Sequence, residues 1–185
     1  MIAAQNNKNT ENNSIIASEV AIIWKLLEEV YDPELPVLSV LDLGIVRDVQ
    51  ITSPSPGGRS WEGVVMITPT YSGCPAMDTI SMGIRLKLIE HGYNNIKVIS
   101  VLSPAWTTGW MSQAGKDKLK AYGIAPPNSN QTEEDTRLFA EPAAIQCPLC
   151  DSFHTKLISR FGSTACKSLY QCHDCKEPFD YFKCH

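Results

Sequence analysis

The sequence predicts an α+β fold: a compact helix-strand-strand-helix-strand-helix domain with a small three-stranded sheet, plus a C-terminal Cys-rich metal-binding ribbon. Segments with apolar residues at helical spacing are interspersed with short segments rich in β-branched residues, which predicts the first part. The ribbon is predicted by the cysteines, because six of the seven lie within the last 39 residues.

The first domain is expected over residues 15–124, after an asparagine-rich tail, residues 1–14, that we expect to be disordered. Apolar residues return at steps of three and four from Ile16, which predicts an amphipathic helix. Pro33 and Pro36 cannot continue this helix, because proline lacks the N–H and clashes with the preceding turn. The segment DPELP is therefore expected to be an extended loop.

Three strands and two further helices complete the expected domain. Residues 45–52 and 61–68 are rich in β-branched residues and flank a loop of proline, glycine and serine, which predicts an antiparallel pair. After Pro75 the apolar spacing becomes helical. A third strand is expected over residues 96–102, and a last short helix over residues 112–122.

A linker and a second module follow. Residues 125–145 are rich in proline, asparagine and acidic side chains, which is typical of a linker. Residues 146–185 are expected to form a zinc-ribbon-like module, in which TKLISRF and KSLYQC pair as a hairpin.

Two CxxC pairs in this module predict a metal site. A tight turn lets both thiolates of one pair face a single ion, and two such turns close a tetrahedral four-thiolate shell. The 21 residues between the pairs are close to the spacing of known zinc sites. We assign structural zinc to Cys147, Cys150, Cys172 and Cys175, although a CxxC pair alone does not distinguish zinc from an iron–sulfur cluster.

Cys166 and Cys184 lie outside these pairs. They are either two free thiols packed in a small domain, or ligands of an additional metal ion or cluster. Their spacing leaves both interpretations open.

The charge distribution argues against some partners. The net charge is −4, with 10 basic against 12 acidic residues over 1–125 and 6 against 8 over 126–185, so neither part is a basic module for nucleic acid. No apolar run is long enough to span a membrane, and the N-terminus lacks the apolar core of a signal peptide. We expect a cytoplasmic protein that binds neither nucleic acid nor membrane.

Cys74, in the stretch YSGCPAM, is the one cysteine of the first domain. Proline favours the first turn of a helix, so Pro75 places Cys74 at the N-cap. Free N–H groups and the helix dipole stabilise a thiolate there. The sequence thus predicts a reactive, metal-competent thiol, and the alternative is a small buried cap residue.

These motifs resemble a known family. DPELP (32–36), DLGIV (42–46) and TPTYSGCP (68–75) occur in the order and spacing of the SufT-like iron–sulfur assembly proteins. Further stretches, FGSTACKSLYQC (161–172) and EPFDYFKCH (177–185), are similar to the PaaD family, the D component of the phenylacetyl-CoA epoxidase system.

The resemblance implies an accessory or maturation factor, not an enzyme, for the ring-1,2-phenylacetyl-CoA epoxidase of aerobic phenylacetate degradation. Such a factor assists the loading of iron or an iron–sulfur cluster. The implied partners are the epoxidase components, with the iron–sulfur reductase subunit as expected client, and the iron–sulfur assembly machinery. The implied cofactors are structural zinc and a transient iron–sulfur cluster. A homodimer whose two Cys74 thiols share a labile cluster is left open.

By resemblance, the transfer site consists of Cys74 assisted by Asp32, Glu34, Asp42 and Thr70. Structural alternatives stand beside these roles. Asp32 before a proline is typical of an Asx-type turn, and Asp42 is placed to cap the DLG turn.

Two rival functions also remain open. One is a structural, zinc-stabilised subunit that docks on the epoxidase, and the other is a thiol enzyme that uses Cys74. A nucleophilic cysteine needs a base within reach, usually histidine. The histidine of the first domain, His91, lies at the far end of the helix after Cys74, roughly 25 Å away at about 1.5 Å per residue. This distance argues against the enzyme, and the open alternative is a histidine of the C-terminal module that folds back toward Cys74.

Overall fold

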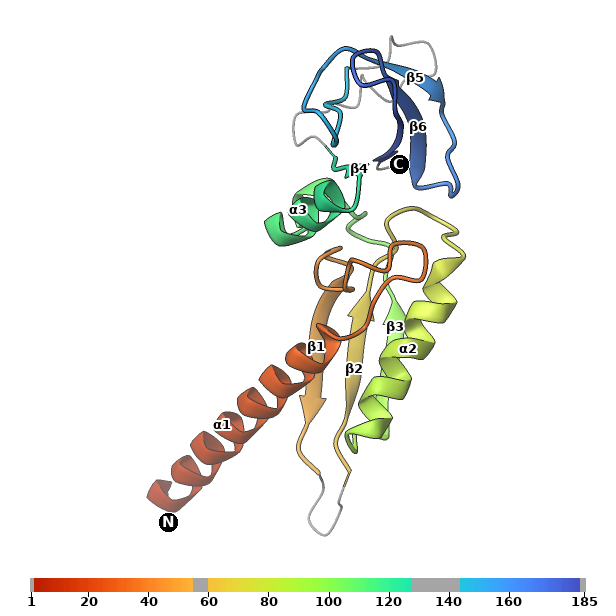
Figure 1. Ribbon diagram of the computed structural model, residues 1–185. Helices are drawn as coiled ribbons and strands as arrows, with labels where there is room; N and C mark the ends of the chain where they lie inside the picture. Colours follow the sequence, from red (N-terminus) through yellow and green to blue (C-terminus); the bar gives the residue numbers. More distant parts are fainter. Residues whose placement is uncertain (1, 55–59, 128–143, 184–185) are drawn as a thin grey trace.

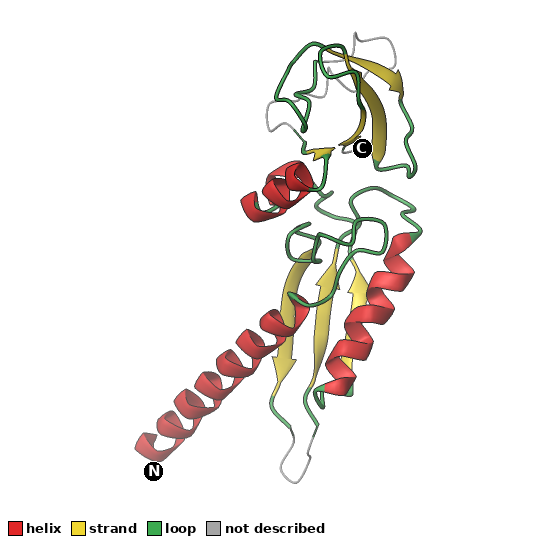
Figure 2. Ribbon diagram, in the orientation of Figure 1, coloured by secondary structure: helices red, strands yellow, loops and turns green. Residues whose placement is uncertain are grey.

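The computed structural model describes residues 2–54, 60–127 and 144–183 and confirms the α+β class (Figures 1 and 2). Its elements are α1 (Ile2–Leu27), β1 (Val46–Thr52), β2 (Glu62–Ile67), α2 (Ala76–Glu90), β3 (Asn95–Ser100), the 3-10 helix η1 (Thr108–Trp110), α3 (Gln113–Ala121), β4 (Ile124–Ala125), β5 (Thr155–Ser159), β6 (Lys167–Cys172) and β7 (Pro178–Phe182). Among these residues, no helix combines the length and the apolar character needed to cross a membrane.

A three-stranded sheet in the order β1-β2-β3 forms the centre of the first domain. β1 pairs antiparallel with β2, as the sequence predicts, whereas β3 pairs parallel with β2. A parallel pair needs a long crossover connection, and α2 supplies it. α1 packs against β1 and α2, and α2 packs against β3, so the two helices cover the sheet (Figure 1).

The buried side of α2 follows the apolar spacing of its sequence. Its buried side chains are Ala76, Ile80, Ile84 and Leu88, one for each turn of the helix. They share one core with alternate residues of the central strand, such as Val65 and Ile67. Each such aliphatic side chain contributes about 1.5–3 kcal/mol when it is fully buried.

α1 begins at Ile2, so the segment 1–14 is helical from its second residue, where the sequence predicts disorder. Residues 2–27 contain neither proline nor glycine, so no residue interrupts the helix. Ile23 and Leu27 in its last turns are fully buried. These residues anchor the helix in the core.

A second sheet in the order β4-β7-β6-β5 forms the ribbon. β5 and β6 pair antiparallel as predicted, but β4 and β7 have no counterpart in the predictions. β4 consists of Ile124 and Ala125, which pair in parallel with Asp180 and Tyr181 of β7. The ribbon therefore includes residues on both sides of the expected boundary after residue 124. Most of the expected linker, residues 128–143, lies outside the described residues.

The ribbon also contributes side chains to the core of the first domain. Cys166 and Phe182 belong to that core rather than to the ribbon's own smaller one. The rings of Phe182 and Trp106 meet edge to face, with their centroids 6.3 Å apart. The indole Nε1–H of Trp106 donates to the carbonyl of Leu43 at 2.8 Å. The two domains thus share an apolar interface.

The substitution Phe182→Ala tests this shared core. Because it leaves a cavity between the domains, we expect it to lower the free energy of unfolding by about 3–5 kcal/mol. The measurement is denaturant unfolding of the metal-saturated protein, followed by tryptophan fluorescence. Phe161→Ala is the matched control, since Phe161 is 66% exposed and its loss should change stability little. Equal effects of the two substitutions would contradict a shared core.

Candidate metal centre and thiol site

The two CxxC turns of the ribbon have the same backbone geometry. In each, the N–H of the first cysteine donates to the carbonyl five residues later, at 2.8 Å and 3.0 Å. The residue after each second cysteine, Asp151 or Lys176, has a positive φ, of 59° and 69° respectively. This left-handed residue reverses the chain directly after the turn.

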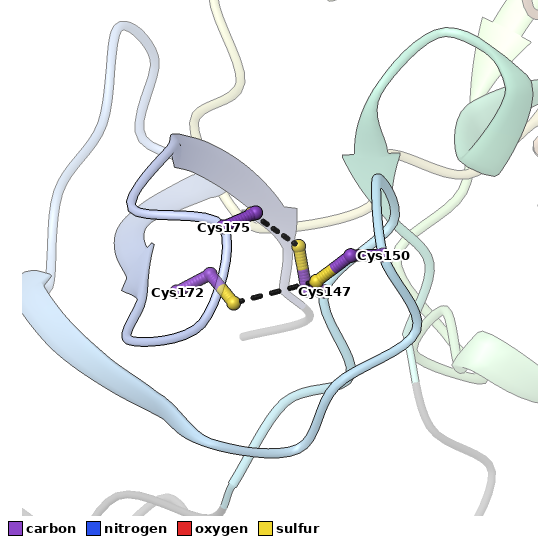
Figure 3. Close-up of side chains that lie close together, drawn as sticks. All are labelled: Cys147, Cys150, Cys172 and Cys175. Carbon is purple, nitrogen blue, oxygen red and sulfur yellow. Dashed lines mark hydrogen bonds between the residues drawn. The ribbon is translucent and has the colours of Figure 1, made fainter.

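The four thiols of these turns face one another (Figure 3). All four sulfurs lie within 4.8 Å of one another. The sulfurs of Cys147 and Cys175 are 3.8 Å apart, and those of Cys150 and Cys172 are 3.5 Å apart. A tetrahedral zinc ion with bonds of about 2.3 Å places its sulfur ligands about 3.8 Å apart. The structure therefore brings together the four ligands predicted from the sequence, in a geometry that fits zinc.

The surroundings of Cys172 favour a thiolate. The N–H of Asp174 donates to its Sγ at 3.4 Å. Burial opposes ionisation of Cys172, but hydrogen bonds from the N–H groups of Cys175 and Asp174 outweigh it and lower the pKa of the thiol to about 7. Four protein thiolates with no open position are the ligand set of a structural rather than a catalytic zinc site.

In the first domain, Asp32 folds the DPELP loop. Its Oδ1 accepts the N–H of Glu34 at 2.7 Å and that of Leu35 at 2.8 Å. Burial raises the pKa of Asp32, although these N–H groups and Lys167 favour its charged form. The two hydrogen bonds are those of the Asx-type turn that the sequence offers as an alternative. Asp32 thus determines where Glu34 points.

Cys74 lies one residue outside the cap position predicted for it. α2 begins at Ala76, its cap residue is Pro75 in a helical conformation, and no side chain makes a capping hydrogen bond. Cys74 belongs to a turn instead: its N–H donates to the carbonyl of Tyr71, and its carbonyl accepts the N–H of Met77, both at 3.3 Å. Because Pro75 already has helical angles, the residue before it is displaced into the preceding loop. The thiol is half-buried.

Groups from three distant segments meet beside this loop. The thiol of Cys166 donates to Oε2 of Glu34 at 3.6 Å, and the hydroxyl of Thr164 lies 3.0 Å from the same sulfur. Tyr71 shares a hydrogen bond with Cys74. Burial, this hydrogen bond and the charges of Cys74, Cys166 and Glu34 raise the pKa of Tyr71 well above its ordinary value. A ribbon thiol that the sequence leaves unassigned therefore lies near Cys74.

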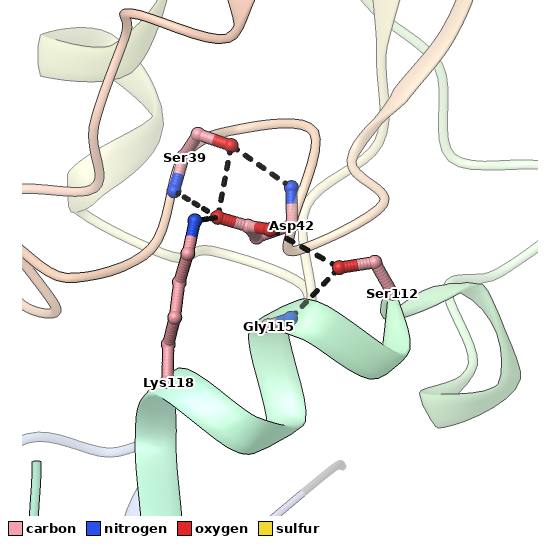
Figure 4. Close-up of polar contacts among 5 residues, drawn as sticks. All are labelled: Ser39, Asp42, Ser112, Gly115 and Lys118. Carbon is pink, nitrogen blue, oxygen red and sulfur yellow. Dashed lines mark hydrogen bonds and ion pairs between the residues drawn. The ribbon is translucent and has the colours of Figure 1, made fainter. Parts of the chain in front are cut away.

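Asp42 lies in a separate network (Figure 4). Its Oδ2 accepts from the N–H and hydroxyl of Ser39, each at 3.1 Å, and from Nζ of Lys118 at 2.6 Å. Its Oδ1 accepts the hydroxyl of Ser112 at 3.1 Å, and Ser112 caps α3 by accepting the N–H of Gly115 at 2.8 Å. Burial opposes ionisation, but Lys118, Ser39 and Ser112 lower the pKa of Asp42. Asp42 thus ties the DLG turn to α3.

The glycine of the same motif is required by its backbone. Gly44 has a φ of +66°, a conformation that side-chain-bearing residues rarely adopt. A Cβ at this position would lie 2.1 Å from the carbonyl oxygen of Trp110. The DLG motif therefore serves the packing of the chain around α3.

Thr70 lines a cavity of about 80 Å³ together with Thr68, Tyr71 and Trp106. The side chain of Thr68 is buried, and its hydroxyl has no hydrogen-bond partner in the part of the chain that the structure describes. Thr70 thus borders the Cys74 loop on the side of Trp106. Cys184, which the sequence leaves as either a free thiol or a ligand of an additional metal ion or cluster, lies outside the described residues.

Tyr71 and the contact of Cys166 with Glu34 are features that the sequence predictions missed. Tyr71 stands three residues before Cys74 in the same motif, so its position alone could have suggested it. No local pattern connects Cys166 with Glu34, because 132 residues separate them.

Known protein families match both parts of the chain. Residues 21–91 match the family described as iron–sulfur cluster assembly protein, and residues 131–183 match the PaaD zinc beta ribbon domain. A protein of Escherichia coli (strain K12), provisionally named as the D component of 1,2-phenylacetyl-CoA epoxidase, is 45% identical over 171 residues. This match covers 92% of the present chain and 96% of the relative.

Two further similarities concern the first domain. A protein of Porphyromonas gingivalis (strain ATCC BAA-308 / W83) named Fe-S protein maturation auxiliary factor is 33% identical over 103 residues, which cover 55% of this chain and 90% of that protein. The crystal structure of a domain of unknown function, DUF59, from Bacillus anthracis is 28% identical with a TM-score of 0.52. It covers 58% of this chain and 97% of that one.

The substitution Cys147→Ser tests the metal centre. A fully buried ligand is lost, so we expect the variant to release zinc and residues 146–183 to lose protection from hydrogen exchange. The first domain should stay folded, because most of its core is its own, with its protection lowered by the loss of Cys166 and Phe182 from that core. Metal analysis and hydrogen exchange by mass spectrometry are the measurements. Cys74→Ser, as control, should retain its zinc. Protection of the ribbon after complete chelation would contradict the assignment.

The substitution Asp42→Asn tests the DLG network. Because it removes the charge from hydrogen bonds to Lys118 and Ser112, we expect it to lower the free energy of unfolding by about 1.5–3 kcal/mol at neutral pH. The folded-state pKa lies below the ordinary value of 3.8, so this stabilisation is present above that value and is lost as the pH falls through the folded-state pKa.

Urea unfolding at neutral and acidic pH measures this difference. It should be largest at neutral pH and should shrink in acid. Asp117→Asn on the exposed side of the same helix α3 is the control and should change stability little. A deficit of Asp42→Asn that is independent of pH would contradict a role for the ionised carboxylate.

Proposed function

The chain belongs to the PaaD family, the D components of phenylacetyl-CoA epoxidase. On that premise we propose that it is a non-catalytic maturation factor, which helps to load iron or an iron–sulfur cluster into the epoxidase. The expected client is the iron–sulfur reductase subunit, because that component carries a cluster. The match of residues 21–91 to iron–sulfur cluster assembly proteins supports this role. The iron cargo is the substrate of such a factor, whereas zinc in the ribbon is its resident metal.

The observation that carries the proposal is the incomplete thiol site at Cys74. This thiol is half-buried, in a loop between β2 and α2, and is the single cysteine of the first domain. One thiolate cannot fill the four-ligand shell that iron–sulfur clusters take. A site with few ligands binds cargo weakly and releases it to a client with a full set. This suits transfer better than storage.

The acids of the family motifs have different roles in this proposal. Asp32 and Asp42 hold the loops, since their oxygens are engaged with backbone and side-chain donors of the fold. Glu34 faces a thiol instead, so it is the acid that we assign to the cargo. Thr70 borders the loop and is assigned to its shape rather than to the metal.

The surroundings of Cys74 do not support a thiol enzyme. A nucleophilic cysteine is activated by an adjacent base. The partner of Cys74 is Tyr71, whose raised pKa keeps it protonated and unable to accept the thiol proton near neutral pH. His91 contacts the carbonyl of Lys87 at the other end of the 15-residue helix α2, which is about 22 Å long at 1.5 Å per residue. His154 pairs with Asp174 next to the ribbon's metal site.

The substitution Cys74→Ser tests the proposed transfer role. Co-expressed with the epoxidase components, it should lower the iron and acid-labile sulfide content of the reductase, because the thiolate that holds the cargo is gone. Its own zinc content should stay unchanged. Ser72→Ala, in the same loop, is the matched control and should support normal loading. Full cluster content in the reductase matured with Cys74→Ser would overturn the proposal and leave a structural docking subunit as the function.

A further inference from the structure

The turn between β5 and β6 reaches from the ribbon to the first domain, and Cys166 lies at its end. In Figure 1 this turn lies beside the loop that precedes α2. Cys166 is 5% exposed and packs in the core of the first domain. Its carbonyl accepts the N–H of Lys183, which follows β7, at 3.0 Å. The cysteine is therefore a fixed part of the interface between the domains.

At this interface Cys166 meets groups that bind metals. Its thiol donates to Glu34 at 3.6 Å. Tyr71, the hydrogen-bond partner of Cys74, lies within the range of the charges of both Cys166 and Glu34. A thiol from the ribbon turn and a carboxylate from the DPELP loop thus meet here, and the Cys74 loop packs against the same core and borders them through Tyr71. Thiolates are the usual ligands of iron–sulfur clusters, and carboxylates also bind iron.

Packing alone does not account for this arrangement. A cysteine that only fills a core behaves as a small hydrophobe with a weak S–H donor, whereas Cys166 places its thiol on a carboxylate from the other domain. Burial, with a contribution from Glu34, raises the pKa of Cys166 to about 11, although Thr164 and Lys167 oppose the rise. Lys183 also lies within range of this thiol. Lys167 and Lys183 are thus in place to balance the negative charge of a Cys166 thiolate.

We propose that Cys166 and Glu34 complete the cargo site of Cys74, so that an iron ion or an iron–sulfur cluster is held across the domain interface by two thiolates and a carboxylate. This inference extends the proposed function and rests on it. On binding, each sulfur binds iron as a thiolate in place of a water or carrier-thiol ligand, which leaves, and any proton on the thiol passes to solvent. Glu34 exchanges its hydrogen bond from Cys166 for an oxygen–iron bond, and no electrons are transferred.

This site is open before cargo arrives. Among the described residues, the four ribbon thiols form the group of ligands already close enough to hold an ion. The Cys74 thiol is hydrogen-bonded to Tyr71, and the Cys166 thiol is hydrogen-bonded to Glu34. Both thiols therefore exchange these hydrogen bonds for bonds to the cargo only when it binds. Asp32 is a positioning residue for this site, because its Asx-type turn directs Glu34.

The test uses the full chain, saturated with zinc and purified without oxygen. Ferrous iron alone, or a preformed [2Fe–2S] cluster on a small-thiol carrier, is added, and iron, acid-labile sulfide and zinc per chain are measured together with the absorption spectrum. The variants are Cys166→Ser, Glu34→Gln and Cys74→Ser, and Ser163→Ala in the same ribbon turn is the matched control. We expect Cys166→Ser and Cys74→Ser each to weaken iron binding by at least about tenfold, since even outer-shell changes cost about 10–100-fold. Glu34→Gln should weaken it less, and Ser163→Ala should match the unsubstituted protein.

The results separate this inference from the proposed function. Full iron binding by Cys166→Ser, with loss in Cys74→Ser, would overturn the inference and leave the proposed function standing. Full binding by both would overturn both. If Cys166→Ser loses zinc as well as iron, its fold has changed and its iron binding does not test the site. The test then rests on Glu34→Gln, which keeps the shape of the side chain. Unchanged iron binding by Glu34→Gln would overturn the inference.

Oligomeric state gives a second readout. If Cys166 supplies the second thiolate, the oligomeric state on size-exclusion chromatography should not change when iron and sulfide are bound. A loaded dimer that forms equally well with Cys166→Ser would show that a second copy's Cys74 completes the site, and would overturn the inference.

Discussion

The position of the ribbon's functional groups depends on four thiols held within 4.8 Å of one another. A module of about 40 residues buries too little apolar surface to fold unaided. A structural zinc ion contributes about 10–16 kcal/mol in small zinc modules, so zinc bound here would decide whether the two CxxC turns form at all. Once both turns are fixed, β5 and β6 extend from them as a hairpin, and the far end of that hairpin carries Cys166 to the first domain. The four-thiol metal centre of the ribbon thus positions Cys166, which belongs to the separate site beside Cys74.

The acidic residues of the two motifs in the first domain have different roles: some hold the fold together, and one faces a thiol. Asp32 and Asp42 both accept hydrogen bonds from the fold, but the one shapes a loop and the other fastens a helix. Glu34 stands two residues after Asp32 and has a thiol as its partner. The Asx-type turn therefore explains why DPE occurs as a unit. Its aspartate and proline fix the backbone, and the carboxylate of its glutamate meets the thiol of Cys166.

The local patterns of the sequence predicted most elements and one metal site, because both depend on short-range spacing. Apolar periodicity predicted α2, β-branched segments predicted β1 and β2, and paired CxxC turns predicted the four ribbon ligands. β4 has only two residues, and it is a strand because it pairs with β7, so no local sequence pattern predicts it. The cap of α2 was predicted at Cys74, one residue before its actual position, because Pro75 itself takes the cap position. The convergence of Cys166 and Glu34 is a property of the assembled fold.

The two thiol sites differ in the way that separates a resident metal from a cargo. Zinc binds nitrogen, oxygen and sulfur ligands more tightly than ferrous iron does, so raw affinity would fill any closed thiolate site with zinc. The ribbon site is closed by four thiolates and keeps what it binds. The site at Cys74 lacks a closed shell, and its two thiols are hydrogen-bonded to Tyr71 and Glu34 before cargo binds. Each sulfur ligand gained there requires one of these hydrogen bonds to break, which lowers the affinity for a single ion. A cluster that binds both thiols at once forms two iron–sulfur bonds, which offset the broken hydrogen bonds more fully. A client with four thiolates binds the cluster more tightly still, so transfer to the client is favourable.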